Sequence, residues 1–187
     1  MKYLFYFIWV VRAIVYKPFF GRIGKFSFIG RPTFLHGIKR IYIGRSVHIF
    51  PNIRLEVVSK NGSIEFENEV SVAQNVHITS GGTLVIKKSS SILANVCITD
   101  IDHDYSEIDI NIRKQKFIIN KTEIGKNCMI GMGAIILAGT HLGTQNIVAA
   151  NSVVRGVFPD YCIIAGSPAK IVKKFNFESK KWEKYEE

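Results

Sequence analysis

The sequence predicts an all-β protein built as a parallel β-helix, and three observations support this fold. First, an aliphatic residue recurs every six positions between Ile124 and Pro159, in the units IGKNCM, IGMGAI, ILAGTH, LGTQNI, VAANSV and VRGVFP. Second, the same spacing occurs earlier in groups of three units. Third, the residues that interrupt the repeat always fall between one group of three units and the next. A six-residue period fits neither a helix nor an ordinary strand, and is typical of β-helices.

Each unit is expected to supply one short strand and one corner of a triangular prism. The first residue of the unit should point into the prism, and the fifth, which is usually small, should turn inward at the corner. Three units close one coil, so we expect about six coils within residues 23–159. The coils begin at Ile23, Ile43, Phe66, Ile86, Ile124 and Leu142.

The interruptions of the repeat indicate a working edge. They add 2, 5, 2 and 20 residues, always between the third strand of one coil and the first strand of the next. Stacked coils place that junction at one edge of the prism, and long insertions at one edge of a repeat array usually carry function. The longest insertion, residues 104–123, exceeds the usual length of a loop without function.

Composition describes one folded domain with a strong positive charge. Of the 187 residues, 47% are hydrophobic and 21% charged, and the net charge is +10. Such a charge attracts anions, among them a phosphorylated cofactor, an acidic glycan, an anionic lipid or nucleic acid. No zinc-finger spacing, recognition-helix pattern or RNA-binding aromatic motif accompanies the cations, so nucleic acid is not an expected partner.

The three cysteines indicate reduced thiols. Cys97, Cys128 and Cys162 are widely spaced and form no CxxC pair. This usage fits a cytoplasmic protein rather than a disulfide framework. No arrangement of cysteine and histidine suggests a thiol nucleophile.

The two ends of the chain are predicted to cap the prism. Residues 1–22 are apolar, but the apolar run is too short to span a membrane and is interrupted by Arg12. The segment is either a helix that covers the open end or a neighbouring subunit, or an interfacial helix in which residues 1–20 contact a membrane surface. Residues 160–187 contain a Gly-Ser-Pro turn and a basic tail, with a capping helix expected over Phe177–Glu187.

His103 is the candidate catalytic residue. It lies at the mouth of the long insertion in the segment ITDIDHDYS, between Asp102 and Asp104 and close to Asp100. A nearby carboxylate can orient an imidazole and raise its basicity, which suits a general base, although a solvated loop histidine would look the same. The aspartates resemble a calcium loop, but Tyr105 replaces its glycine, and no metal is expected.

His77 and Cys97 occupy equivalent positions on adjacent coils. The strand spacing places their backbones about 5 Å apart. The two side chains either line a pocket or only stack on one another.

The hexads, the ITDIDHDYS segment, the run VAANSVVRGVFPDY and the ending AGSPAKIVKK together resemble the left-handed β-helix (hexapeptide-repeat) acyltransferases. The resemblance covers about Ile23 to Lys174 and is greatest to O-acetyltransferases of capsule, lipopolysaccharide and exopolysaccharide biosynthesis. It implies left-handed coils, acetyl-CoA as the acyl donor, and a homotrimer that binds CoA between adjacent subunits.

The same resemblance implies roles for individual residues. His103 would act as general base, and the backbone N–H of Met132 would stabilise the oxyanion. Asp100 and Asp102 are added as assisting catalytic residues because of their positions beside His103. The positions that match CoA contacts are Gly131, Met132, Ala150, Arg155, Lys170 and Lys173. Their positions, and not the resemblance, make His77, Asn75, Asn95 and Tyr105 the candidate substrate-binding residues.

Two departures from the family pattern stand out. Arg155-Gly156 replaces the usual Thr-Lys, and Ala73 stands where sugar acetyltransferases carry an acceptor-binding Asn. The second departure argues against a simple galactoside or maltose enzyme.

Three functions are therefore compared. The leading hypothesis is an acetyl-CoA-dependent O-acetyltransferase that modifies a sugar or glycan hydroxyl in bacterial surface polysaccharide biosynthesis. The alternatives are an N-acyltransferase acting on an amino sugar nucleotide and a non-catalytic trimeric scaffold. The expected location is cytoplasmic, with peripheral attachment to the inner membrane as the alternative.

Overall fold

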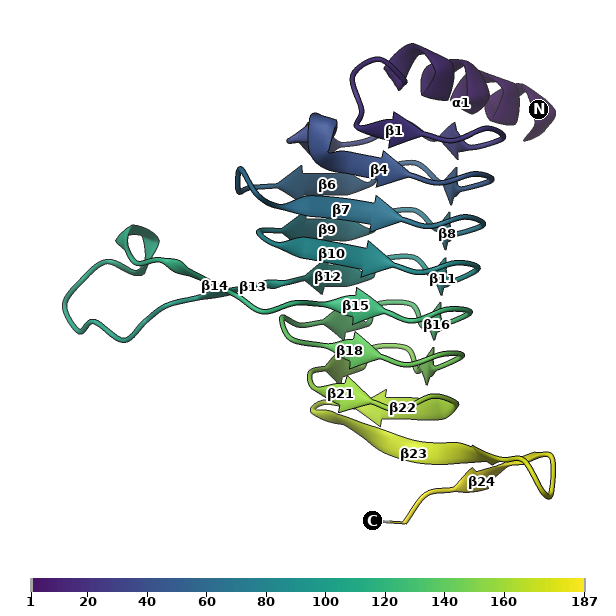
Figure 1. Cartoon of the computed structure of the whole chain (residues 1–187), viewed down its shortest axis with the longest axis vertical. Helices are drawn as coiled ribbons and strands as arrows, with labels where there is room; N and C mark the ends of the chain where they lie inside the picture. The colour runs from purple at the N-terminus through teal and green to yellow at the C-terminus, as the bar shows by residue number, and fades with distance from the viewer. Residues whose placement is uncertain (1, 187) are drawn as a thin grey trace.

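The structure, a computed structural model that describes residues 2–186, is a triangular prism of stacked coils with a helix across one end and an arm on one side (Figure 1). The helix, α1 (Lys2–Tyr16), lies over the first coil. Strands at the front of Figure 1 run to the right and those behind run to the left while the chain descends, so the coils are left-handed. The predicted fold, including its unusual handedness, is confirmed.

Three sheets, which we call A, B and C in the order in which each coil visits them, form the faces of the prism. Sheet A contains β1 (Arg22–Ile23), β4 (Ile41–Ile43), β7 (Ser63–Phe66), β10 (Thr83–Ile86), β15 (Glu123–Ile124), β18 (His141–Leu142) and β21 (Val157–Phe158). Sheet B contains β2 (Phe28–Ile29), β5 (His48–Ile49), β8 (Ser71–Val72), β11 (Ser91–Ile92), β16 (Met129–Ile130), β19 (Ile147–Val148), β22 (Cys162–Gly166), β23 (Ala169–Asn176) and β24 (Lys181–Lys184). Sheet C contains β3 (Phe34–His36), β6 (Arg54–Val57), β9 (His77–Ser80), β12 (Cys97–Thr99), β17 (Ile135–Ile136) and β20 (Val153–Val154).

The edges of the prism are named after the sheets that they join: AB, BC and CA. Six complete coils are followed by a partial seventh, formed by β21 and β22, so the repeat continues beyond Pro159. In this last coil Ile164 pairs with Val148 in the same parallel register as the coils above. The expected number of about six coils is confirmed, with this extension.

The core follows the six-residue period. The first residues of the units point inward and nearly all are fully buried, from Ile43 and Ile49 to Val148 and Val154. Most fifth positions are also buried, and several of the polar ones hydrogen bond to the neighbouring corner. Ser90, for example, donates to the carbonyl of Gly125 at 2.7 Å and accepts from the N–H of Cys128 at 3.0 Å. Paired in this way, the buried hydroxyl avoids the cost of an unsatisfied polar group.

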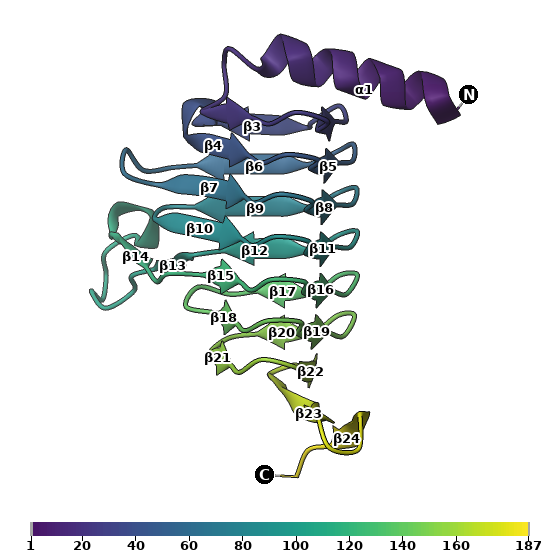
Figure 2. The same ribbon diagram turned by 45° about the vertical axis from the view of Figure 1, so that its right-hand side comes forward.

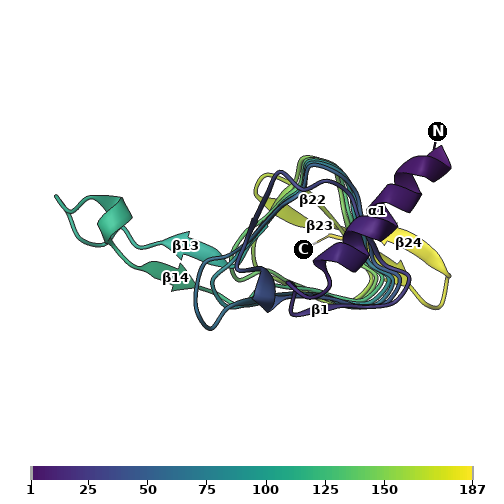
Figure 3. The same ribbon diagram turned by 90° about the horizontal axis from the view of Figure 1, so that it is seen from above.

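The arm is an antiparallel hairpin rather than an irregular loop, and it begins at Ile101, before the predicted insertion at residues 104–123. Its strands are β13 (Ile101–His103) and β14 (Phe117–Ile119), and a short 3-10 helix, η2 (Ile112–Lys114), lies near its tip. A second 3-10 helix, η1 (Ile38–Arg40), leads into β4. Figure 3 shows the arm projecting from the CA edge, where the sequence placed the insertions.

The expected helix at Phe177–Glu187 is wrong over the described residues. Strand β24 instead pairs antiparallel with β23, with Phe175 opposite Trp182. The rings of these two residues pack at 5.4 Å, and Phe177 packs on Phe175 at 5.1 Å. Strand pairing and this aromatic cluster outweigh the weak helical periodicity of the tail, because tertiary contacts override local propensity.

The N-terminal segment is helical, as both alternatives required, and α1 covers the open end of the prism. Within residues 2–186, none of the helices is both long enough and apolar enough to cross a membrane.

Candidate active site

His103 lies at the base of the arm, where β13 leaves the CA edge. It pairs with Phe117 across the hairpin, and its ring meets the Phe117 ring edge-on at 5.0 Å. One residue farther along the hairpin, the N–H of Asp104 donates a hydrogen bond to the carbonyl of Lys116 at 3.0 Å. The imidazole is exposed, so the hairpin holds it in place while leaving it open to another molecule.

Asp100 anchors the arm to the prism. The side chain is fully buried, and its two oxygens accept hydrogen bonds from the N–H of Gly81 at 2.7 Å and the N–H of Gly82 at 2.9 Å. The hydroxyl of Ser80 donates a third at 2.8 Å. On the other strand of the arm, Asn120 donates its N–H to the Asp100 carbonyl at 2.9 Å. The side-chain contacts are with the coil above and the backbone contact is with the arm, so Asp100 supports the base of the arm rather than facing His103.

Replacing Asp100 by asparagine is therefore expected to destabilise the protein. The three surrounding donors need a carboxylate, and the amide would turn an N–H towards one of them. We expect the free energy of unfolding to fall by about 1–3 kcal/mol, the usual cost of an unsatisfied buried polar group. Urea unfolding measures this change, with Asp102→Asn, which alters a partly exposed carboxylate, as the control. Equal effects of the two variants would contradict the anchoring role.

Asp102 pairs with Arg155 and not with His103. Its Oδ1 lies 2.9 Å from Nη2 of Arg155, which follows β20 on the same CA edge. Neighbouring residues of a strand project to opposite faces, so Asp102 and the adjacent His103 point away from one another. The pair is half exposed, and such pairs contribute about 1 kcal/mol or less. Arg155 thus contacts the arm, on a different edge from the Ala150 corner with which the sequence grouped it.

The Met132 corner lies on the BC edge between β16 and β17. Gly131 is required there, because a Cβ atom would come within 2.6 Å of the Ala150 nitrogen on the next coil. The N–H of Gly131 donates to the carbonyl of Val148 at 2.8 Å, and the Met132 carbonyl accepts from Asn151 at 2.9 Å. Among the described residues the Met132 N–H has no partner. The corner therefore offers an unpaired backbone donor at an exposed residue.

Lys170 lies below this corner, near the BC edge. It is opposite Ala165 in the antiparallel pair of β22 and β23, next to the turn that ends β22. Lys173 pairs with Ile163 and lies farther from that edge. Both side chains are exposed. The structure therefore brings Gly131, Met132, Ala150 and Lys170 together along one edge.

His103 and Met132 lie on opposite edges of sheet C within one chain. Met132 precedes β17, His103 follows β12, and these strands are parallel neighbours with Cys97 beside Ile135. At 3.3 Å per residue the two positions are separated by roughly 10 Å or more. A single chain does not bring the predicted base and the predicted oxyanion donor together.

The candidate substrate residues fall into two groups. Asn75 and Asn95 are BC corner residues with φ of 59° and 62°, a left-handed conformation that asparagine tolerates, and their side chains hydrogen bond at 3.1 Å. The left-handed backbone conformation at these corners is a sufficient reason for asparagine at both positions. Tyr105 lies just beyond His103 and is 76% exposed, so it shares the arm with the predicted base.

His77 belongs to a polar ladder on sheet C that sequence reasoning recognised only in part. Its Nε2 lies 2.9 Å from the Thr79 hydroxyl and 3.6 Å from Glu56, which also pairs with Arg54. The predicted adjacency of His77 and Cys97 on neighbouring coils is confirmed by the strand register. Aligning the units in register would have found Arg54, because Arg54 and His77 pair in the same way.

The thiols are unsuited to nucleophilic chemistry. Burial raises the pKa of Cys128 to about 11, and it also raises the pKa values of Cys97 and Cys162. Each thiol is therefore protonated at neutral pH, whereas the thiolate is the reactive form. Within residues 2–186, no cluster of three histidine, cysteine or acidic side chains is arranged to hold a metal ion.

Comparison with known proteins identifies the family. Residues 121–156 match the bacterial transferase hexapeptide (six repeats) family. Over 185 residues the chain is 33% identical to a putative lipopolysaccharide biosynthesis O-acetyl transferase, WbbJ, of Escherichia coli K12, which covers 95% of this chain and 93% of that protein. This chain belongs to the bacterial hexapeptide-repeat transferases. The predicted family and enzyme class are confirmed.

Solved structures share the fold of this hexapeptide-repeat transferase. AntD, an N-acyltransferase from Bacillus cereus in complex with dTDP and 3-hydroxybutyryl-CoA, has a TM-score of 0.74 at 20% identity over 90% of each chain. A galactoside acetyltransferase in complex with coenzyme A has a TM-score of 0.60 at 22% identity, covering 94% of this chain and 78% of that one. At these identities the likeness establishes the architecture.

Proposed function

We propose that this hexapeptide-repeat transferase is an acetyl-CoA-dependent O-acetyltransferase that modifies a sugar hydroxyl in bacterial surface polysaccharide biosynthesis. The observation that carries the proposal is the placement of His103, an exposed imidazole held at the base of a projecting arm. Similarity over nearly the whole chain to a lipopolysaccharide O-acetyl transferase supports the choice of acceptor.

The active site forms between neighbouring subunits of a homotrimer. The arm exposes Phe117, Ile118 and Ile119, and the BC edge exposes Met129 and Met132. Exposed apolar groups that gather in this way mark interaction surfaces. Because the two patches lie on different edges, they fit a head-to-tail contact that closes into a ring. This contact would carry His103 of one subunit to the Met132 corner of the next.

The chemistry is direct acyl transfer. His103 removes the proton from the acceptor hydroxyl while the oxygen attacks the thioester carbonyl of acetyl-CoA. The new C–O bond gives a tetrahedral intermediate, and the Met132 N–H donates to its oxyanion. Collapse of the intermediate breaks the C–S bond, and the proton held by His103 passes to the departing thiolate of CoA.

CoA would lie along the BC edge. Gly131, Met132 and Ala150 provide a narrow backbone wall, and Lys170 and Lys173 meet the phosphates below it. On the facing arm, Tyr105 would contact the acceptor beside the base. Arg155 is proposed to position the arm through Asp102 and not to bind the phosphates directly. The reaction belongs in the cytoplasm, where acetyl-CoA is available.

The second candidate is N-acylation of an amino sugar nucleotide, and the similarity in fold to AntD favours it. A hydroxyl and an amine acceptor need the same base, so acceptor competition distinguishes them. The purified protein is incubated with acetyl-CoA and either nucleotide-linked amino sugars or hydroxyl-bearing surface glycans. We expect one acetyl group to be added to the glycan, as detected by mass spectrometry. Transfer only to amines would support the second candidate, and transfer to neither acceptor would support a scaffold.

A further inference from the structure

The helix α1 has one face that caps the prism. Ala13 is buried against the first coil, Tyr6 meets the Phe28 ring at 5.3 Å, and Trp9 meets the Phe50 ring at 5.6 Å. The guanidinium group of Arg12 donates to the Ile29 carbonyl at 3.2 Å. Figures 2 and 3 show that the N-terminal part of α1 extends beyond the prism instead of ending over it.

The opposite face of α1 has no polar residue over positions 4–15. Every described residue that is exposed there is apolar: Leu4, Phe5, Phe7, Ile8, Val10, Val11, Ile14 and Val15. Phe7 and Ile14 are each 65% exposed. A contiguous exposed apolar face marks an interaction surface, so this face requires a partner beyond the described chain.

The positive charge of the chain is concentrated beside this face. The first 55 residues contain ten Lys or Arg residues and no Asp or Glu, whereas residues 56–187 contain fifteen of each kind. The net charge of +10 therefore comes entirely from the end of the chain that forms α1 and the first two coils. Exposed cations of this region include Lys17, Lys25, Arg31, Lys39 and Arg45.

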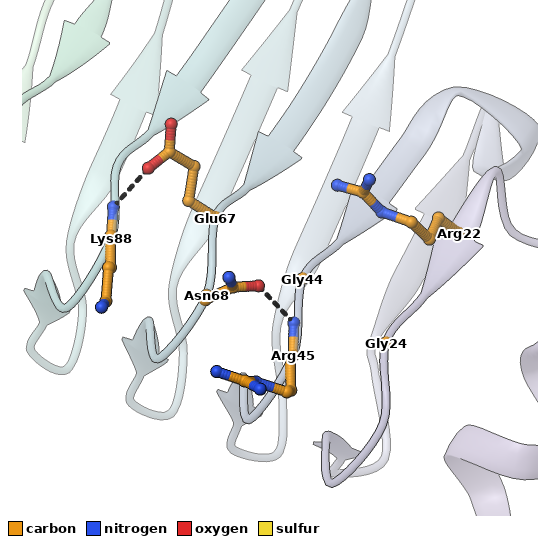
Figure 4. Close-up of a pocket in the computed structure, with 7 residues that line it drawn as sticks. All are labelled: Arg22, Gly24, Gly44, Arg45, Glu67, Asn68 and Lys88. Atoms are coloured by element: carbon orange, nitrogen blue, oxygen red, sulfur yellow. Dashed lines mark hydrogen bonds between the residues drawn. The ribbon is translucent and has the colours of Figure 1, made fainter.

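The cations continue down the AB edge into an open cleft. Figure 4 shows Arg22 and Arg45 extending over this cleft, which Gly24 and Gly44 also line. The carboxylate of Glu67 is turned to the N–H of Lys88, from which it accepts a hydrogen bond at 2.9 Å. Among the described residues neither arginine has a carboxylate within 4.0 Å. The positive charge of these two arginines is therefore not neutralised by carboxylates of the described chain.

We propose that α1 and the cations of the first two coils dock the protein on an anionic phospholipid membrane surface. The apolar face would enter the boundary between headgroups and acyl chains, and the nearby cations would be attracted to the anionic headgroups. A second copy of the same face is a poor occupant, because it would bring together two cationic ends. A trimer with parallel prisms would present three such faces at one end and bind with avidity.

Vesicle flotation of the full chain tests the docking face. The wild type is expected to float with vesicles of phosphatidylcholine and phosphatidylglycerol, and to remain behind with vesicles of phosphatidylcholine alone. The double variant Phe7→Ser with Ile14→Ser should lower binding at least tenfold, since two exposed apolar groups leave the interface. Phe177→Ser, which is equally exposed at the opposite end, is the matched control and should bind as the wild type does.

A charge pair completes the test. Lys17→Gln with Lys25→Gln should also weaken flotation, whereas Lys180→Gln with Lys181→Gln should not. Wild-type binding that is equal on neutral vesicles, or unaltered flotation of Phe7→Ser with Ile14→Ser, would overturn the proposal. A change in solution mass of that variant without a change in flotation would make the face a contact between copies. Acetyl transfer to a soluble acceptor should be unaffected by these variants, so the result does not depend on the proposed reaction.

Discussion

Replacing His103 by alanine is expected to lower kcat for acetyl transfer by about 10²- to 10⁴-fold, the usual contribution of a general base. The acceptor hydroxyl would then have to lose its proton to water. The imidazole is exposed and its one described ring contact is with Phe117, so the fold should be retained. Steady-state kinetics measure the loss, and calorimetric titration with CoA should show unchanged affinity.

His36→Ala is the matched control for this variant. His36 is also an exposed histidine at the end of a sheet C strand, but it lies on the first coil, away from the arm. Its substitution should leave kcat unchanged. If His103→Ala retained wild-type turnover, or if both variants lost it equally, His103 could not be the base.

The prism could be predicted almost completely from the sequence, because one physical rule is repeated in every coil. A position that points inward must be apolar and a tight corner must be small, so the burial of Ile43 or Val148 follows from the six-residue period. The CA edge could be located for the same reason, since the interruptions of the repeat fall between the third strand of one coil and the first strand of the next. The repeated pattern thus predicts which residues are buried, whereas the sequence of one two-residue strand would not.

The arm and the C-terminal tail lie outside the repeat, and the sequence was a weaker guide there. Spacing placed Asp100 and Asp102 beside His103, but the first is directed into the coil above and the second towards Arg155. The orientation of these two side chains depends on how the strands of the hairpin pair and alternate. The six-residue period does not predict that pairing. Similarly, the tail pairs as β24 with β23, a tertiary choice that overrides its helical pattern.

Replacing Met132 by proline should lower kcat by about 10²- to 10³-fold, the usual cost of losing one oxyanion donor. Proline removes the backbone N–H and also fixes φ, a restraint that this type of corner accepts. The chain itself contains the precedent, because Pro51 occupies the same corner position three coils above, two residues after Ile49 in the register that links Ile49 to Ile130. Met132→Ala keeps the N–H and should remain active in the same kinetic assay. Equal activity of the proline and alanine variants would remove Met132 from the mechanism.

Mixing the two inactive chains tests where the site forms. A trimer assembled from His103→Ala and Met132→Pro chains contains some junctions at which an intact His103 faces an intact Met132 corner. Random assembly from equal amounts gives such junctions about a quarter of the time, so activity should recover to about a quarter of the wild-type level in a head-to-tail ring. A site within one chain gives no recovery, because every chain then carries one defect. Because His103 and Met132 lie on opposite edges of one chain, we expect the mixed trimers to recover activity. If no activity returned after the subunits had exchanged, a site shared between subunits would be contradicted.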